Sequence, residues 1–336
     1  MLYGRLIQRW ERRLHARDGE RVVRPFEWGL EWLGLGGASE LGRYADEVVG
    51  SSERFFAYEP ARDYRFDGEW LRFSSPLLSP HPENNVVHAR YFPARRALGR
   101  AVLVLPQWNA DEQGHVGLCR LLNIYGLSAL RLSLPYHDRR RPPGLLRADY
   151  AVSSNVGRTL HANRQAVLDA RAALDWLQAR GYSRLGVLGT SLGSSIAFIS
   201  AVHDPRLRAA VLNHVSTWFA DVVWRGLSTA HVRAGLEGAI ALEELRRYWA
   251  PISPASYVTR LIARRRTCGD LRALIVWARY DLSFPPDLSR RYMNLLRESG
   301  LPYQELCLPC GHYTTAVTPF KWMDGVGMAR FLARNL

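Results

Sequence analysis

Short, mainly apolar segments recur through the last two-thirds of the chain, and the first of them is uninterrupted. The first covers residues 101–105 and stops at Pro106. Five more runs of similar length follow, at residues 129–134, 185–188, 209–212, 273–278 and 303–308. Runs without polar alternation are typical of strands that are buried on both faces, as in a parallel sheet.

Helical patterns separate these predicted strands. The clearest covers residues 160–180, and Gly181 follows it as a helix-ending residue. Its apolar side chains recur at helical spacing, at Val167, Ala170, Leu174 and Leu177. Strands that alternate with helices at this spacing predict right-handed βαβ units. The expected fold class is therefore α/β, with a mostly parallel, doubly wound sheet.

Two stretches fall outside this alternation. Residues 1–66 read as a helical N-terminal extension, which ends before the turn signal Asp67-Gly68. Residues about 214–269 are helical and rich in tryptophan where one short connection would be enough. We therefore expect an N-terminal extension over residues 1–66, and one α/β domain over residues 67–336 that carries a helical cap insertion.

Charge and composition exclude several functions. The 336 residues carry a formal net charge of +14, but Lys321 is the only lysine and the arginines are spread along the chain. Nucleic acid is therefore not an expected partner. A phosphate loop requires a lysine directly after its glycines, and Lys321 does not follow such a motif. The sequence also lacks a His-Glu-x-x-His metal-binding motif and a complete dinucleotide-binding fingerprint. Neither a metal nor an organic cofactor is expected.

The cysteines and the N-terminal residues do not indicate a further function. The spacing of Cys307 and Cys310 fits a redox or half-zinc site, but it lacks a second metal-binding pair, so a structural role is favoured. The first 24 residues lack an apolar signal-peptide core, and no apolar run is long enough for a transmembrane segment. A cytoplasmic protein is the default expectation.

One motif carries chemistry. Gly189-Thr190-Ser191-Leu192-Gly193 lies between the predicted strand 185–188 and an apolar helical run at 196–202. A sharp strand-turn-helix connection exposes the serine hydroxyl above the sheet edge, and the flanking glycines let neighbouring backbone approach. A serine hydroxyl is a weak nucleophile until a correctly oriented base takes its proton. This context makes Ser191 the candidate nucleophile.

Two residues that could activate Ser191, an aspartate and a histidine, follow it in the sequence. Asp281 comes just after the predicted strand 273–278, and His312 comes just after the strand 303–308. Over residues 100–336 the chain resembles the α/β-hydrolase superfamily. The resemblance implies that Ser191 is the nucleophile, Asp281 the acid and His312 the base. Other carboxylates stay open as the acid, namely Asp221, Asp270 and Asp287.

The oxyanion hole requires two backbone N–H groups. Leu192, the residue after the nucleophile, is expected to supply one. The second should come from the loop after residues 101–105, where the family often carries His-Gly and this chain reads Pro106-Gln107-Trp108-Asn109. By position we assign the N–H of Trp108, with Gln107 as the alternative.

Further residues are candidates for contact with substrate. His137 and His214 each follow the end of a predicted strand, where ligands bind in open α/β sheets. Gln107 lies in the candidate oxyanion loop. Trp218 begins an apolar stripe of the insertion, which continues through Phe219, Val222 and Val223. Such a stripe could line an acyl pocket, although it more often packs a cap onto the core. Arg139 to Arg141 read as a solvated loop.

These features predict a serine hydrolase that cleaves a carboxylic ester through an acyl-enzyme. The expected substrate is a small molecule or a lipid-like acyl compound. The same triad serves thioesters, peptides and amides, so a thioesterase or a peptidase/amidase is an alternative. A non-catalytic ligand-binding protein on a hydrolase fold is the other. The sequence leaves the oligomeric state open.

Overall fold

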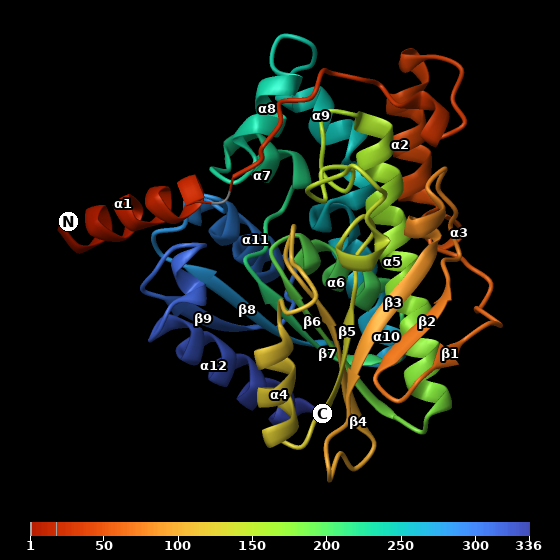
Figure 1. Ribbon diagram of the computed structural model, residues 1–336, viewed down its shortest axis with the longest axis vertical. Coiled ribbons are helices and arrows are strands. Elements are labelled where there is room, and N and C mark those ends of the chain that lie inside the picture. Colours follow the sequence, from red (N-terminus) through yellow and green to blue (C-terminus); the bar gives the residue numbers. More distant parts are fainter. Residues whose placement is uncertain (1, 18) are drawn as a thin grey trace.

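A computed structural model describes residues 2–17 and 19–336 (Figure 1). These residues form one sheet of nine strands in the order β1-β2-β3-β5-β4-β6-β7-β8-β9. Strands β4 to β9 are mutually parallel, and β1 to β3 form an antiparallel edge. The strands are β1 (Arg65–Phe66), β2 (Trp70–Ser74), β3 (Val86–Phe92), β4 (Arg100–Leu105), β5 (Ser128–Leu132), β6 (Arg184–Thr190), β7 (Leu207–Asn213), β8 (Arg272–Ala278) and β9 (Gln304–Leu308).

The apolar runs form strands because both faces of the sheet are covered. In β4, Ala101, Leu103 and Leu105 enter one hydrophobic core, whereas Val102 and Val104 enter a second one on the opposite face. All five side chains are fully buried. A central strand without polar positions is stable only where helices cover both of its faces.

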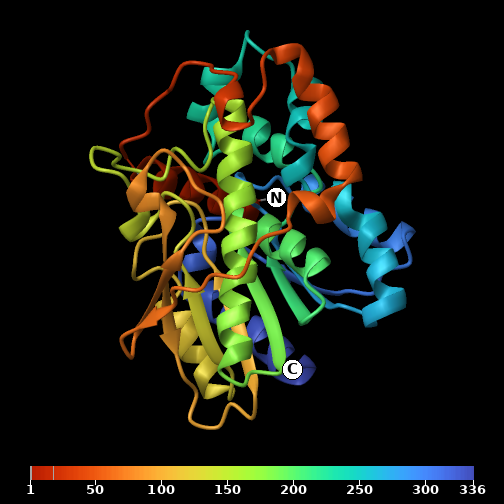
Figure 2. The same cartoon turned by 90° about the vertical axis from the view of Figure 1, so that its right-hand side faces the viewer.

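Helices pack on both faces of this sheet (Figures 1 and 2). One face carries α4 (Val116–Ile124) and α12 (Phe320–Asn335). The other carries α5 (Val156–Ala179), α6 (Leu192–His203), α10 (Val258–Cys268) and α11 (Pro286–Glu298). The predicted α/β class and mostly parallel sheet are thus confirmed.

The first helices and the insertion pack against each other. The N-terminal segment holds α1 (Leu2–Arg17), α2 (Leu41–Gly50) and α3 (Ser52–Phe55), and the insertion holds α7 (Phe219–Arg225), α8 (Ala230–Leu236) and α9 (Leu242–Tyr248). α2 packs on α9, where Asp46 and Arg247 form an ion pair at 2.6 Å. The division into extension and cap stays a prediction. Within the described residues no helix has the length and apolar character of a membrane span.

The register of the parallel strands gathers their carboxyl ends at one edge. Thr190 of β6 pairs with Asn213 of β7, so Ser191 and His214 leave the sheet side by side. Ala278 of β8 pairs with Leu308 of β9 in the same way. The loops after these strands, which carry Asp281 and His312, therefore meet at this edge.

Candidate active site

Ser191 occupies a strained turn between β6 and α6. Its φ of 56° and ψ of −116° lie outside the regions that residues with a side chain usually adopt. The turn closes because its two glycines lack side chains. A Cβ on Gly189 would lie 2.0 Å from the carbonyl oxygen of Gly193, and one on Gly193 would lie 2.2 Å from that of Leu105. The surrounding backbone therefore fixes the serine at the end of β6.

Asp281 and His312 form a buried pair beside this turn. Nδ1 of His312 lies 3.1 Å from Oδ2 of Asp281. The other carboxylate oxygen accepts the N–H groups of Ser283 and Phe284, both at 2.7 Å. The carboxylate is thus held rigidly toward the imidazole, which leaves Nε2 of His312 for proton transfer.

The charges of this pair stabilise each other. Burial opposes the imidazolium form, but attraction to the Asp281 carboxylate outweighs burial and raises the pKa of His312. Burial would raise the pKa of Asp281, but the two histidines beside it hold that pKa well below its usual range. Asp281 is therefore ionised at neutral pH and favours a protonated His312, as a triad acid must during catalysis.

The alternative acids lie elsewhere. Each pairs with an arginine, Asp270 with Arg265, Asp287 with Arg225 and Asp221 with Arg246, at 2.6 to 2.7 Å. Among the described carboxylates, Asp281 is the one in contact with His312 through a hydrogen bond. The geometry thus favours Asp281 over the other candidates.

His214 also contacts the triad carboxylate. Its Nδ1 lies 2.8 Å from Oδ2 of Asp281, and its ring centroid lies 4.5 Å from that of His312. Burial first, and then repulsion from His312, lower the pKa of His214, so this ring is neutral. His214 lines the cavity as predicted from the sequence, but its close contact is with the catalytic acid.

His214, Asp281 and His312 also form the described cluster whose ligand atoms lie close enough, within 4.8 Å, to hold a metal ion. Nδ1 of His214 and Nδ1 of His312 lie 2.8 and 3.1 Å from the same carboxylate oxygen of Asp281, and the His312 contact has hydrogen-bond geometry. A ring nitrogen that carries a proton for such a contact has no lone pair for a metal. The arrangement thus fits proton transfer better than metal binding.

The candidate oxyanion donors lie on adjacent loops. Leu192 is the first residue of α6, where N–H groups have no partner within the helix. The Trp108 N–H donates to no acceptor among the described residues. Close contact of Gly193 with the end of β4 holds the two loops together. The assignment of Leu192 and Trp108 stays a prediction.

The side chains of the second loop have distinct roles. The Trp108 indole donates to the Ala148 carbonyl at 2.9 Å and stacks on His231. Oε1 of Gln107 is buried and has no hydrogen-bond partner among the described residues, although Gln107 lines the cavity. Gln107 therefore offers a free acceptor beside the nucleophile.

Ser191 and His312 open onto one cavity of about 690 Å³. The volume suits a small organic ligand or part of a lipid. One arm of the cavity runs between α4 and α12, and its lining is mainly apolar, namely Leu118, Leu121, Trp322, Gly325 and Met328. The Ser191 hydroxyl has no hydrogen-bond partner among the described residues; in free enzymes catalytic hydrogen bonds are often loose.

A buried carboxyl group borders this arm. Asp324 of α12 accepts a hydrogen bond from Nδ2 of Asn213 at 2.9 Å. Burial raises the pKa of Asp324 to about 7. At neutral pH the apolar arm therefore contains a carboxyl group that is protonated in a large fraction of molecules.

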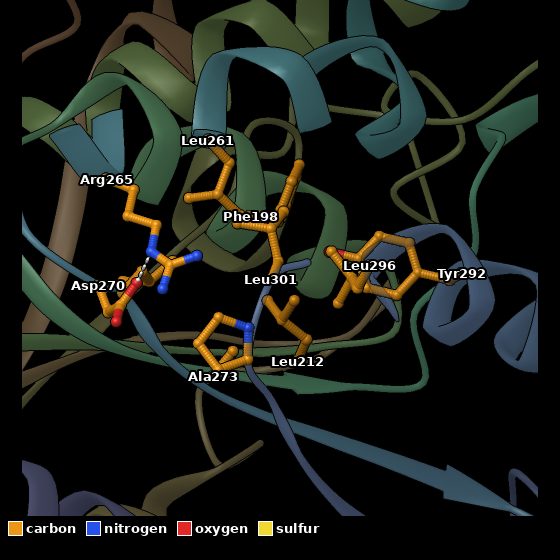
Figure 3. A pocket seen from close by; sticks show the side chains of 11 residues that line it. Phe198, Leu212, Leu261, Arg265, Asp270, Ala273, Tyr292, Leu296 and Leu301 are labelled. Carbon is orange, nitrogen blue, oxygen red and sulfur yellow. Dashed lines mark ion pairs between the residues drawn. The ribbon is translucent and has the colours of Figure 1, made fainter. Parts of the chain in front are cut away.

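A second, much smaller cavity lies on the opposite face of the sheet, under α10 and α11 (Figure 3). Its volume is about 20 Å³, barely room for one water molecule. Phe198, Leu212 and Tyr292 line it, and the ion pair of Arg265 and Asp270 lies at its edge. It is a packing gap without room for a substrate.

Two predicted pocket residues do not line the cavity. His137 is buried, and its Nε2 accepts the N–H of Asn109 at 3.0 Å, so it supports the candidate oxyanion loop from behind. Trp218 immediately precedes α7. The stripe that it begins is buried in the core, where Phe219 packs on Trp249 and Val223 is fully covered. The expectation that this stripe lines the pocket is corrected.

The expected solvated arginine loop is corrected at Arg140, whereas Arg139 and Arg141 are exposed as expected. Arg140 is fully buried and pairs with Asp169 at 2.8 Å, while Arg139 pairs with Glu112 at 2.6 Å. These contacts hold the loop to the body of the protein. Arg140 thus has a structural role in place of the solvated one expected from the sequence.

Glu11 is a site residue that sequence reasoning missed. Its buried carboxylate accepts the N–H groups of Tyr313 at 3.0 Å and Thr314 at 2.7 Å, directly after His312. A Cβ on Gly311 would lie 2.4 Å from the Glu11 carboxyl carbon. Burial raises the pKa of Glu11. A single glutamate in an arginine-rich helix gives no sequence signal for such a contact.

Comparisons with known proteins show the fold. A scan of protein-family models finds no match, and a search of curated sequences finds none either. Among solved structures, the acylaminoacyl peptidase of Pyrococcus horikoshii aligns with a TM-score of 0.62 at 13% identity, over 82% of this chain and 42% of the peptidase. The chain thus spans less than half of that protein.

Two esterases align over nearly their whole length. The acetyl xylan esterase from Paenibacillus sp. R4 has a TM-score of 0.58 at 16% identity, over 90% of this chain and 96% of its own. Acetyl xylan esterase 1 from Thermoanaerobacterium sp. JW/SL YS485 has a TM-score of 0.57 at 13% identity, over 96% and 98%. The chain has the α/β-hydrolase fold that the sequence predicted.

Proposed function

We propose that the protein is a serine hydrolase that cleaves carboxylic esters through an acyl-enzyme. One observation carries the proposal: a strained serine and a buried histidine–aspartate pair open onto the same ligand-sized cavity. Strain at a single residue is retained where it serves function. Similar solved structures include esterases and a peptidase, which supports hydrolysis without specifying the bond.

The chemistry follows from the positions of the groups. Oγ of Ser191 attacks the ester carbonyl carbon while Nε2 of His312 takes the hydroxyl proton. The carbonyl electron pair moves to oxygen, where the N–H groups of Leu192 and Trp108 stabilise the negative charge. The carbon–oxygen bond to the alcohol then breaks, and His312 returns its proton to the departing oxygen.

Water completes the cycle. It attacks the acyl carbon with His312 as base, and the bond to Ser191 breaks as the serine oxygen regains a proton. Asp281 stays ionised throughout and stabilises the imidazolium. The apolar arm between α4 and α12 is the proposed binding site for the acyl chain.

Active-site labelling tests this proposal. A fluorophosphonate probe should label the wild-type protein and the control Ser195→Ala, because Ser195 lies one turn along α6 from the nucleophile. Ser191→Ala should lose both labelling and hydrolysis of p-nitrophenyl butyrate while it keeps its circular dichroism spectrum. Full labelling of Ser191→Ala would overturn the assignment. A comparison of matched ester, thioester and anilide substrates identifies the bond that is cleaved.

A further inference from the structure

Helix α1 presents an unusual surface to solvent. It extends from the body of the molecule at the left of Figure 1. Ile7 and Glu11 are buried and define its inner side. The opposite side, here called the α1 outer face, consists of exposed side chains that are either apolar or cationic: Leu2, Arg5, Leu6, Arg9, Trp10, Arg12, Arg13 and Arg17.

The apolar members of this face are strongly exposed. Leu2 is 74% exposed and Leu6 is 56% exposed, and they lie one helical turn apart. Trp10 continues the same row by one more turn. Such a row on the solvent-facing side of a helix leaves apolar area in water that a partner would cover.

Among the residues that the structure describes, none neutralises the positive charge of this face. None of its arginines forms an ion pair with another described residue. Glu11, the one acidic residue of α1, is buried on the inner side. Many arginines elsewhere are paired, as Arg225 is with Asp287. The α1 outer face therefore attracts anions.

The inner side of α1 connects this helix to the lining of the cavity. On its inner side, α1 holds the loop after His312 through Glu11. The next residues of that loop, Thr315 and Ala316, line the cavity. Trp322 of α12 also lines the cavity and is 55% exposed, so the cavity reaches the surface there, beside the exposed Met323.

We propose that the α1 outer face, together with Trp322 and Met323, docks on an anionic lipid surface. The leucines and tryptophans would enter the boundary between headgroups and acyl chains, and the arginines would bind lipid phosphates. Docking places the cavity opening at the bilayer. This identifies the substrate class as acyl esters of membrane lipids, a part of the proposal that rests on the proposed serine hydrolase function.

Other anionic or apolar partners fit this face less well. A nucleic acid would bind the arginines but leave Leu2 and Leu6 without an apolar partner. A symmetric second copy would bring two positively charged faces together, which repel each other. An anionic bilayer satisfies the charge and the apolar row together.

Vesicle flotation tests the docking. The probes are vesicles of phosphatidylcholine alone, and vesicles of equal parts phosphatidylcholine and phosphatidylglycerol. We expect the full chain to float with the anionic vesicles, to be released by high salt, and to remain unbound with phosphatidylcholine alone. Equal binding to both vesicles, or binding to neither, would overturn the proposal.

Matched variants locate the surface. Arg9→Glu/Arg13→Glu and Leu2→Ser/Leu6→Ser should each lower binding to anionic vesicles by about tenfold or more. The controls are Arg95→Glu/Arg96→Glu and Leu98→Ser, because these residues are exposed on the loop between β3 and β4, and Leu98 is 74% exposed. Controls that lose binding equally, or α1 variants that keep it, refute the assigned surface. A dimer that Leu2→Ser/Leu6→Ser dissociates, without vesicle binding, would assign the face to a second copy instead.

Activity assays separate this proposal from the proposed function. The α1 variants should keep fluorophosphonate labelling and wild-type kcat/KM on soluble p-nitrophenyl butyrate. Their hydrolysis of a phospholipid in anionic vesicles should fall in proportion to binding. Vesicle binding without labelling would refute the hydrolase and leave the docking surface, whereas labelling without vesicle binding would do the reverse.

Discussion

His214 lies closer to Asp281 than His312 does, because its Nδ1 is 2.8 Å from Oδ2 of Asp281, against 3.1 Å for Nδ1 of His312. The two rings share one carboxylate oxygen, so each contact weakens the other. His214 is buried and neutral because burial and His312 lower its pKa. We infer that it positions Asp281 and moderates the pull of this carboxylate on His312.

His214→Ala should therefore strengthen the contact between Asp281 and His312. The pKa of His312 should rise, which shifts the acid limb of the kcat/KM profile to higher pH by roughly half a unit or more. His214→Asn, which keeps a donor near the Nδ1 position, should restore most of the wild-type profile. An unchanged profile in His214→Ala would show that the ring only fills space.

The wild-type pH profile should reflect the raised pKa of His312. Because the base must be neutral to accept a proton, kcat/KM should increase through a pKa above the ordinary histidine value of about 6.5. The same pair adds stability that is complete below that value and is lost as pH rises through the folded-state pKa.

Asp281→Asn reverses this effect. Without the carboxylate, burial remains and lowers the pKa of His312, so the acid limb should move to lower pH while kcat falls by about 10⁴-fold. Asp287→Asn is the control, because Asp287 pairs with Arg225 at the surface. The assigned triad would be contradicted if Asp287→Asn lost most of its kcat while Asp281→Asn stayed active.

Asp324 should make stability depend on pH. Its pKa of about 7 in the folded state lies above the unfolded value, so its neutral form is favoured by folding. The stability that Asp324 contributes is therefore complete below the unfolded pKa of 3.8, is lost as pH rises from there to about 7, and stays lost at higher pH. Asp324→Asn removes this loss and should stabilise the protein above pH 7 by on the order of a few kcal/mol.

Thermal unfolding checks the effect of Asp324. The Tm of Asp324→Asn should match that of the wild type more closely near pH 4, exceed it increasingly as pH rises to about 7, and exceed it by a constant amount at higher pH. The Asn213 donor is kept, so packing changes little. A difference in Tm that does not change with pH would mean that the carboxyl group is not the cause.

The arm between α4 and α12 should set the acyl chain length. Leu118→Trp adds bulk to this arm, so long acyl chains should no longer fit into it. The value of kcat/KM for long p-nitrophenyl esters should fall by several-fold for each methylene group that the arm no longer holds, while the acetate ester should be unaffected. Ile124→Trp is the matched control, because Ile124 lies on the same helix but is exposed and away from the cavity. Equal profiles for the two variants would place the acyl chain elsewhere.

The sequence by itself determined the strands of the sheet and the serine turn, because these depend on neighbours along the chain. A run such as residues 101–105 is stable only between two covered faces, and Gly189 and Gly193 allow a turn that other residues would block. The order of Ser191, Asp281 and His312 followed from strands that end at one sheet edge.

Only the tertiary structure decided which groups contact those residues. Glu11 and Thr314 are 303 positions apart, and the helix that carries Glu11 gives no local sign of its partner. The stripe at Phe219 and Val223 shows that one side of α7 is apolar, but not which surface covers it. Periodicity indicates which side of an element is buried, whereas the partner of that side depends on how distant elements pack. This packing placed the apolar arm of the cavity between α4 and α12.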